Sequence, residues 1–187
     1  MKEMSFVKKA CICAVCIALC YVLPIAFHVF GAGTVFLPMH IPVLLCGLIC
    51  GWGYGALCGV VGPVLSSVLS GMPPATALVS MIPELCVYGL AGGLLLRFVH
   101  TKHTYADLYI ALVSAMLLGR IVGGVAKALF YLSGMSGMTE FSFSLLAATY
   151  FFESLPGIVI QLLLLPTLVF TLMKAKLIPE RYPKAAK

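Results

Sequence analysis

The stretch that decides the fold covers residues 43–71 and reads VLLCGLICGWGYGALCGVVGPVLSSVLSG, without a single charged side chain. Its 29 residues exceed the roughly 20 that one helix needs to cross a bilayer. Inside it, Gly51-Trp52-Gly53 places two glycines around a tryptophan, a residue type that concentrates at membrane surfaces. We therefore expect a turn there, with a short helix over about 40–50 and a longer one over about 54–70.

The composition of the whole chain is that of a membrane protein. Of its 187 residues, 62% are hydrophobic and 10% are charged, and the mean hydropathy is +1.12. Soluble domains are about 45–50% apolar and about 25% charged. The composition excludes an ordinary soluble enzyme, a disordered chain and a nucleic-acid-binding module. We expect residues 1–187 to form one integral membrane domain that is surrounded by lipid.

The other apolar runs complete the expected architecture. They lack the alternation of polar and apolar residues that is typical of a barrel strand, so we expect helices. The predicted fold is an all-α membrane bundle of six transmembrane helices, over about 10–30, 40–50, 54–70, 75–98, 108–132 and 145–173. The outer loops would then be 31–39, 71–74 and 133–144, and we expect them to cap an outward-facing pocket.

The distribution of basic residues favours six helices over five. Ten of the twelve Lys and Arg residues lie outside the expected spans or, in the case of Arg97, at the very end of one. With six helices all ten fall on one side, whereas with five helices the two near Lys102 and the five of the C-terminal tail would fall on the other side. Cytoplasmic segments carry the Lys/Arg excess, so both termini are predicted to be cytoplasmic. Lys8-Lys9 and the run after it imitate a signal peptide, but five later spans favour an uncleaved first helix.

Four charged residues fall in the interior of the expected spans: Glu84, Arg120, Lys127 and Glu153. A charge at the bilayer centre costs about 2.5–3.5 kcal/mol, so each must face protein or water. At about 1.5 Å per residue, Glu84 and Arg120 lie roughly 14 and 18 Å below the outer helix ends. By the same rise, Lys127 and Glu153 lie roughly 8 and 10 Å deep. The sequence therefore predicts two charge pairs at two levels.

Two interpretations of these charges stay open. They could form structural salt bridges that hold the last three helices together. Alternatively, they could line a cavity that is open to the outside, with Gly123-Gly124 leaving clearance for a solute. The second is favoured because intramembrane ionisable groups are usually functional. Tyr88 shares a helix face with Glu84, and Tyr150 and Gln161 add a hydroxyl and an amide.

The cysteines and histidines do not predict a metal site or a disulfide framework. The eight cysteines, at positions 11, 13, 16, 20, 46, 50, 58 and 86, all fall in the expected helices. Cys13 and Cys16 have CxxC spacing, but no second pair accompanies them. We expect the cysteines to act as small packing residues. His28, His100 and His103 do not form a ligand set, so no metal and no cofactor is predicted.

Ala10, Ala14 and Ala18 recur every four residues on the first helix, a spacing that allows close helix contact in lipid. With this helix, six predicted spans and cytoplasmic termini, the chain resembles the substrate-binding S component of an energy-coupling factor (ECF) transporter. Three stretches carry the resemblance: FLPMHIPVLLCG at 36–47, GWGYGA at 51–56 and GMPP at 71–74. The resemblance covers nearly all of residues 5–175.

The resemblance implies a high-affinity binding subunit for a vitamin or vitamin precursor in a prokaryotic cell membrane. A transmembrane coupling subunit (the T component) and two ABC ATPases would drive uptake, and Ala10, Ala14 and Ala18 would face the coupling subunit. The chain has no GxxxxGK[ST] motif, so ATP hydrolysis is expected on the partners, and the chain is not expected to be an enzyme. By the same resemblance the pocket maps onto Glu84, Tyr88, Arg120, Lys127, Glu153 and Gln161, together with loop residues near Met39-His40. With the hydroxyl of Tyr150 added, the predicted substrate-binding residues are His40, Glu84, Tyr88, Arg120, Lys127, Tyr150, Glu153 and Gln161.

The substrate stays open at this stage. Charges of both signs favour a polar, carboxylate-bearing solute, which leaves pantothenate-like acids, pterin or flavin vitamins, B6 forms and queuosine precursors. Met39-His40-Ile41-Pro42 also resembles the start of nickel and cobalt S components, but Met39 is internal and offers no free amine. Two other functional classes stay open. One is an integral membrane enzyme that uses Glu84 and Glu153, although the sequence shows no nucleophile or metal set for it. The other is a structural membrane subunit.

Overall fold

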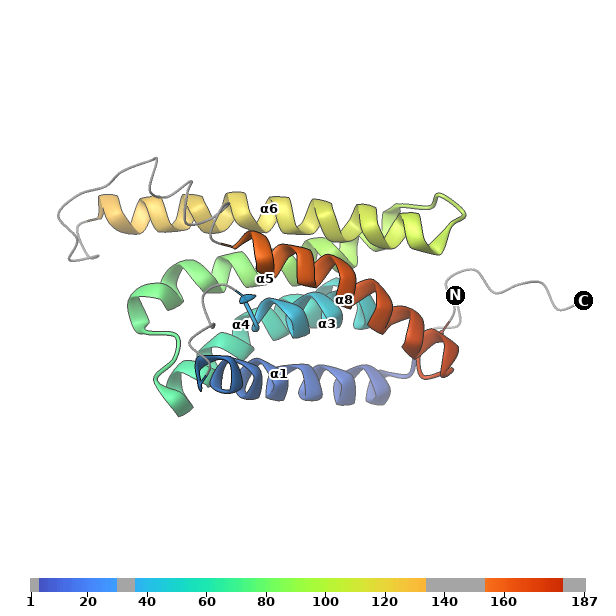
Figure 1. The fold of residues 1–187 in the computed structure, drawn as a ribbon, viewed down its shortest axis with the longest axis horizontal. Helices are drawn as coiled ribbons and strands as arrows, with labels where there is room; N and C mark the ends of the chain where they lie inside the picture. The colour runs from blue at the N-terminus through green and yellow to red at the C-terminus, as the bar shows by residue number, and fades with distance from the viewer. Residues whose placement is uncertain (1–3, 30–35, 134–153, 180–187) are drawn as a thin grey trace, which may run out of the picture.

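A computed structural model describes residues 4–29, 36–133 and 154–179 of the chain. Within these residues the protein is all-helical (Figure 1). The helices are α1 (Phe6–Val29), α3 (His40–Cys50), α4 (Trp52–Ser70), α5 (Ala75–Phe98), α6 (Thr104–Leu132) and α8 (Leu155–Lys174). The prediction of an all-α membrane protein is confirmed, and the helices α3 and α5 have the bounds expected from the sequence.

A single glycine, Gly51, separates α3 from α4, whereas the sequence predicted a three-residue turn at Gly51-Trp52-Gly53. Gly51 has φ 98° and donates its backbone N–H to the carbonyl of Gly47, which closes the last turn of α3. A positive φ of this kind is accessible to glycine and strained for other residues. The chain therefore reverses direction within one residue, and α4 begins at Trp52.

The length of α3 departs from the expectation of six membrane-crossing helices. With 11 residues, α3 is about 16 Å long, which is roughly half the thickness of a bilayer core. Of the helices in the described residues, five are long and apolar enough to cross a membrane. The distribution of basic residues did not predict the short length of α3. Placing the basic residues on one side requires the chain to reverse at Gly51, but it does not require α3 to cross the whole bilayer.

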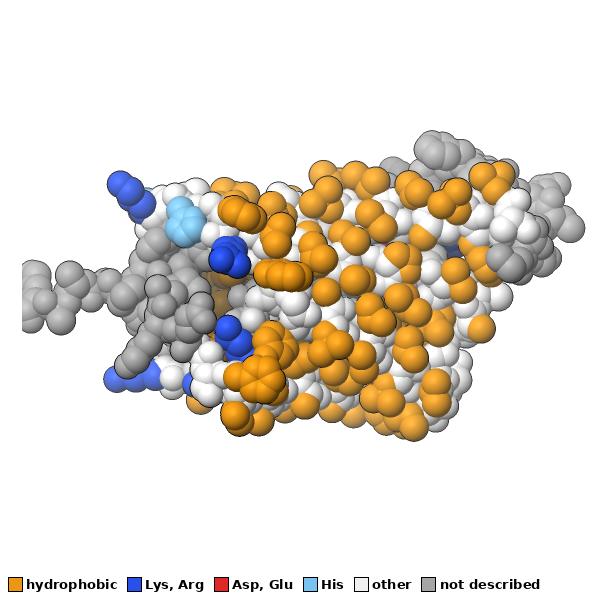
Figure 2. Space-filling model, turned by 180° about the vertical axis from the view of Figure 1, so that it is seen from behind, with side chains coloured by type: hydrophobic (Ala, Val, Ile, Leu, Met, Phe, Trp, Pro, Cys, Tyr) orange, Lys and Arg blue, Asp and Glu red, His pale blue; other side chains and the backbone are white. Residues whose placement is uncertain are grey.

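Apart from Arg120 and Lys127, the described Lys and Arg residues lie at one end of the bundle. One cavity at this end of the bundle is lined by Met4, Lys9, Gly51, Arg97 and Pro179. The first and last described residues of the chain therefore lie near the turn after α3 and near the C-terminus of α5. The ribbon shows the same arrangement (Figure 1). In the space-filling view, Lys, Arg and His side chains gather at this end, and hydrophobic side chains cover most of the remaining face (Figure 2).

Glycines bring α3, α4 and α5 into backbone contact. A Cβ atom added at Gly55 of α4 would lie 2.6 Å from the Cα of Gly47 in α3, and it would also collide with the carbonyl of Gly89 in α5. A Cβ atom added at Gly59 would collide with the backbone of Leu85. Because no side chain separates these helices, the short helix α3 is held in a fixed position against α5.

The helix α8 begins later than the sequence suggested. We expected a helix from about residue 145, but α8 begins at Leu155, with Pro156 in its first turn. Proline is favoured there because its missing N–H would have no helical partner and its φ suits the helix start. Residues 145–153 lie outside the described part of the chain.

Six of the eight cysteines pack in the core beside α1, whereas Cys11 is exposed and Cys86 is half-buried. Cys13, Cys16 and Cys20 lie on the inner face of α1 and are at most 3% exposed. They belong to the same buried cluster as Cys46, Cys50 and Cys58 of α3 and α4, and all eight cysteines are free thiols. This placement agrees with the expected role of these residues as small packing groups.

Candidate functional site

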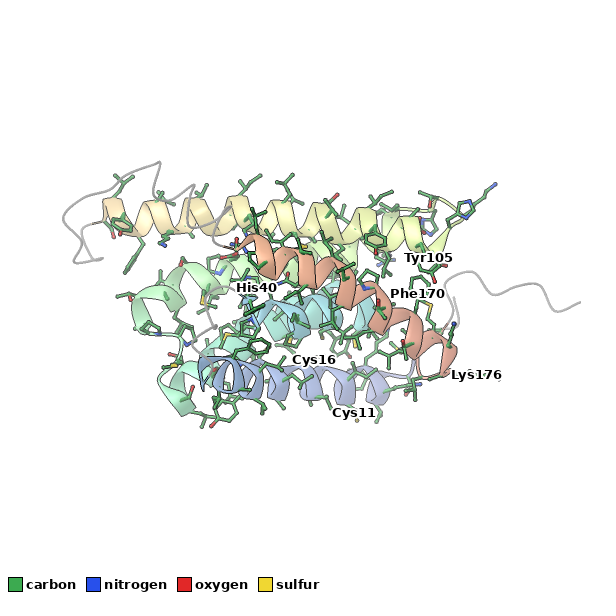
Figure 3. All side chains as sticks on the ribbon, viewed as in Figure 1. Cys11, Cys16, His40, Tyr105, Phe170 and Lys176 are labelled. Atoms are coloured by element: carbon green, nitrogen blue, oxygen red, sulfur yellow. The ribbon has the colours of Figure 1, made fainter. Side chains whose placement is uncertain are left out.

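The candidate site is built around the carboxylate of Glu84 in α5. Glu84 Oε1 lies 3.4 Å from His40 Nε2, at the start of α3, and 3.8 Å from Arg120 Nη1 in α6. Both distances exceed the range of about 2.7–3.2 Å that is typical of N–H···O hydrogen bonds. Figure 3 shows His40 inside the bundle, at the first residue of α3. The predicted pairing of Glu84 with Arg120 is therefore present, with His40 as a third member.

The three side chains are almost completely buried. His40 is 2% exposed, Glu84 is 3% exposed and Arg120 is 6% exposed. A buried ion pair loses hydration on both partners, and removing one partner costs about 3–5 kcal/mol because the other charge stays uncompensated. The carboxylate and the guanidinium therefore hold each other in place between α5 and α6.

Tyr88 extends this polar cluster by one turn of α5. Its side chain is fully buried, and its ring meets the His40 ring edge to face with centroids 5.1 Å apart. A Cβ atom at Gly119 of α6 would lie 2.9 Å from the Tyr88 ring. Tyr88 and His40 thus pack in a space that depends on Gly119, a residue that the sequence analysis did not identify.

Gly123 has a different role from the one expected. We had expected it to leave clearance for a solute, but a Cβ atom at Gly123 would lie 2.6 Å from Glu84 Oε2. The carboxylate of Glu84 itself fills this space. The glycine therefore allows the acidic side chain of α5 to approach the backbone of α6, and the expectation of a gap for a solute at Gly123 is wrong.

Two buried polar atoms of the predicted site have no hydrogen-bond partner among the described residues. They are His40 Nδ1 and the amide nitrogen Nε2 of Gln161, a residue of α8 that is 1% exposed. Most buried polar groups in proteins are hydrogen-bonded, and an unsatisfied one costs about 1–3 kcal/mol. The helix α8 packs against both α3 and α6, the helices that carry His40 and Arg120.

The remaining predicted residues are the second charge pair, Lys127 and Glu153, and the aromatic residue Tyr150. Lys127 is half-buried on α6, two turns beyond Arg120. Tyr150 and Glu153 lie outside the described residues, so the pairing of Lys127 with Glu153 stays a prediction. Among the described residues, no group of three or more His, Cys, Asp or Glu side chains could hold a metal ion.

A separate cavity lies at the basic end of the bundle, and the sequence analysis missed it. Its volume is about 480 Å³, and Gly93 of α5 contributes to its wall. Gly93 lies nine residues after Glu84, about 14 Å further along α5. None of the six predicted substrate-binding residues that the structure describes lines this cavity. It is therefore distinct from the polar cluster.

The predicted partner face of α1 is exposed over part of its length. Ala14 and Ala18 are exposed and Ala10 is half-buried, whereas Cys13 and Cys16 face the core. The small-residue stripe thus lies on the side of α1 that the rest of the described chain leaves uncovered.

Comparison with known proteins identifies the family. A family model described as "ECF transporter, substrate-specific component" matches residues 8–171. No curated protein and no solved structure gives a significant match. The matched residues include every helix that carries the polar cluster and nearly all of the described chain. Members of this family are substrate-binding transport subunits rather than enzymes. From this match and the all-helical membrane fold, we conclude that the chain belongs to the substrate-specific components of ECF transporters.

Proposed function

We propose that the protein is the high-affinity binding subunit for a vitamin or vitamin precursor in an ATP-driven ECF uptake transporter. The observation that carries this proposal is the buried cluster of Glu84, Arg120 and His40, accompanied by polar atoms of His40 and Gln161 that have no partner among the described residues. Leaving buried polar groups without hydrogen-bond partners costs folding free energy, and ionisable groups inside a membrane usually have a function. Binding a polar solute would satisfy them.

The chemistry of the cluster favours a solute with an acidic or carbonyl oxygen. The Arg120 guanidinium carries several donors in a planar fork that matches a carboxylate, and the Gln161 amide nitrogen is a donor as well. A carboxylate of the solute would compete with Glu84 for Arg120. The cationic and amide donors therefore favour a carboxylate-bearing or carbonyl-bearing nutrient, with Tyr88 packed beside it.

Family membership supports the proposed partners and location. We propose that Ala10, Ala14 and Ala18 contact a transmembrane coupling subunit, and that two ABC ATPases supply the energy. The exposure of Ala14 and Ala18 supports this contact. We further propose that the protein lies in a prokaryotic plasma membrane with its basic end in the cytoplasm, because cytoplasmic segments carry the Lys/Arg excess.

A structural role for the cluster is the second candidate. It is favoured by the tight fit of Glu84 against Gly123, because the carboxylate fills the space that a ligand would need there. In this alternative the ion pair only joins α5 to α6. Neutral substitutions at both partners would then leave transport intact.

Uptake of radiolabelled vitamins tests the proposed function. Cells that lack their own uptake systems would express the chain with or without the coupling subunit and the ATPases. We expect accumulation of one labelled compound only when all components are present. Accumulation that persists without the ATPases would contradict the proposed mechanism.

A further inference from the structure

The cavity at the basic end has no role in the proposed nutrient site. It is half-open and lies between the first residues of α1, the turn joining α3 to α4, and the last turn of α5. Its polar wall includes Lys9, Arg97 and His100, and its apolar wall includes Leu48 and Leu96. Its volume of about 480 Å³ is within the range of small-molecule pockets and is much larger than one water molecule.

The described part of the cavity wall is positively charged. Lys9 comes from α1 and Arg97 from α5, and none of the described residues that line the cavity is Asp or Glu. The nearest described carboxylate along the chain is that of Asp107, which is fully buried and accepts hydrogen bonds of 2.7 and 2.6 Å from Thr101. Within the described residues, no carboxylate forms a salt bridge with Lys9 or Arg97.

The first turn of α4 adds to this positive field. Trp52, Gly53 and Tyr54 line the cavity, and they are the first three residues of a 19-residue helix. The preceding Gly51 offers no side chain to cap them. Backbone N–H groups at a helix start carry a partial positive charge and favour an anion. The helix start thus adds a partial positive charge to the full charges of Lys9 and Arg97, which are the main attraction for an anion.

The position of the cavity corresponds to the surface of a membrane. Trp52 at its edge is 47% exposed, and Phe98 and Tyr105, at the ends of the neighbouring helices, are 71% and 61% exposed. Exposed aromatic residues of this kind concentrate where hydrocarbon meets headgroups. Figure 2 shows basic side chains at this end next to a largely hydrophobic face. In a membrane, these aromatic residues would place the mouth of the cavity at the level of the phospholipid headgroups.

We propose that this cavity binds the headgroup of an anionic phospholipid from the leaflet at the basic end. The lipid phosphate would accept hydrogen bonds from Lys9 and Arg97, since basic pockets between transmembrane helices suit phosphate-bearing headgroups. The acyl chains would extend along the exposed apolar face of the bundle. The source is a membrane lipid rather than free phosphate, because the cavity joins a cationic wall to an apolar one at headgroup depth.

Native mass spectrometry of the full chain tests this proposal. The protein would be released from nanodiscs that contain equal amounts of phosphatidylglycerol and phosphatidylcholine. The cavity variant is Lys9→Gln/Arg97→Gln. The matched control is Lys102→Gln/Lys176→Gln, which removes two positive charges from residues that do not line the cavity. We expect the unaltered protein and the control to retain one phosphatidylglycerol, and the cavity variant to retain about tenfold less.

Three outcomes would overturn the proposal. Equal retention of both lipids by the unaltered protein would exclude a preference for anionic headgroups. Equal losses in the cavity and control variants would mean that only overall charge matters. Displacement of the lipid by millimolar inorganic phosphate would identify the site as one for free anions. The conservative variant Lys9→Arg/Arg97→Lys, which should retain the lipid, separates loss of binding from loss of folding.

Discussion

Glu84 brings a carboxylate into the middle of an apolar bundle, where its nearest charged neighbour is Arg120 at 3.8 Å. At this distance and with little exposure, neither charge is tolerable alone. Gln161 Nε2 and His40 Nδ1 have no hydrogen-bond partner among the described residues, which supports our proposal that the cluster binds a ligand in addition to joining the helices.

The first prediction concerns Arg120. Arg120→Gln keeps a hydrogen-bonding side chain but removes the charge that a ligand carboxylate needs. We expect the dissociation constant of the co-purified nutrient to rise about 30-fold or more, as the loss of a charge-assisted hydrogen bond implies. Isothermal titration calorimetry of the protein in detergent measures this change. Lys102→Gln is the control, and an unchanged affinity in Arg120→Gln would remove Arg120 from the site.

The second prediction separates binding from stability. Glu84→Gln alone should lower the free energy of unfolding by about 3–5 kcal/mol, because it leaves Arg120 buried without its counter-ion. The double variant Glu84→Gln/Arg120→Gln should recover most of this loss but should still not bind the nutrient. Unfolding in mixed detergent measures the first quantity. A double variant that is stable and binds normally would support the purely structural alternative.

The pairing of Glu84 with Arg120 could be predicted from the sequence, because the depth of each residue depends only on where its helix ends and on the helical rise. The place of His40 beside them could not be derived this way. It depends on the half-length helix α3 and on its glycine contacts, which are properties of the packed structure. Gly119 was missed for the same reason.

Among the helices, α3 matters most for the site, because its first residue is His40. The helix is held by Gly47, where an added Cβ would collide with the backbone of Gly89 in α5. Gly55 of α4 makes an equally close approach. These contacts fix where α3 begins, and they therefore fix the distance from His40 to Glu84.

The third prediction concerns this backbone contact. Gly55→Ala should lower the free energy of unfolding by about 1–3 kcal/mol or more, because the new methyl group meets backbone atoms that cannot rotate away. Gly53→Ala, two residues earlier in the same helix, is the control, since nothing lies within 4 Å of a Cβ atom there. Thermal unfolding followed by circular dichroism compares the two. Equal melting temperatures would show that the three helices are not tightly packed at Gly55.

The fourth prediction concerns the exposed face of α1. Ala14→Trp should prevent co-purification with the coupling subunit, because a large side chain keeps the two helices apart. Nutrient affinity should be unchanged, since Ala14 is exposed and lies outside the polar cluster. Val15→Trp, about 100° further round the helix, is the control, because Val15 is 59% exposed. Normal assembly of the Ala14→Trp variant would exclude this face as the contact.

At the scale of the whole molecule, the reversal of the chain at Gly51 brings the described Lys and Arg residues to one end of the bundle, apart from Arg120 and Lys127 inside α6. The aromatic stack of Tyr105 on Phe170, with ring centroids 3.7 Å apart, joins α6 to α8 on the way to that end (Figure 3). The polar cluster lies about 14 Å from the basic cavity along α5. The molecule thus separates a candidate nutrient site from a candidate lipid site.

The fifth prediction concerns orientation. With the basic end in the cytoplasm, a membrane-impermeant maleimide added to whole cells should label Met72→Cys, which is 43% exposed in the loop between α4 and α5 at the opposite end. It should not label Thr101→Cys, between α5 and α6. The unaltered chain controls for its own cysteines. The reverse labelling pattern would invert the proposed topology.

The overall arrangement was largely predictable because hydrophobic length and Lys/Arg distribution are properties of the sequence. The basic cavity was not, since its wall combines residues from α1, α3, α4 and α5 that come together only in the folded chain. The late start of α8 also escaped prediction, because apolar residues continue on both sides of Pro156 and hydropathy alone does not mark a helix start there.

The central claim is that the buried charges of Glu84 and Arg120 receive a nutrient. Native mass spectrometry of the protein purified in mild detergent tests it most directly, with the Glu84→Gln/Arg120→Gln variant purified in parallel. We predict that the unaltered protein carries one polar, vitamin-like molecule per chain and that the folded variant carries none. The same molecule bound equally to both proteins would contradict the claim.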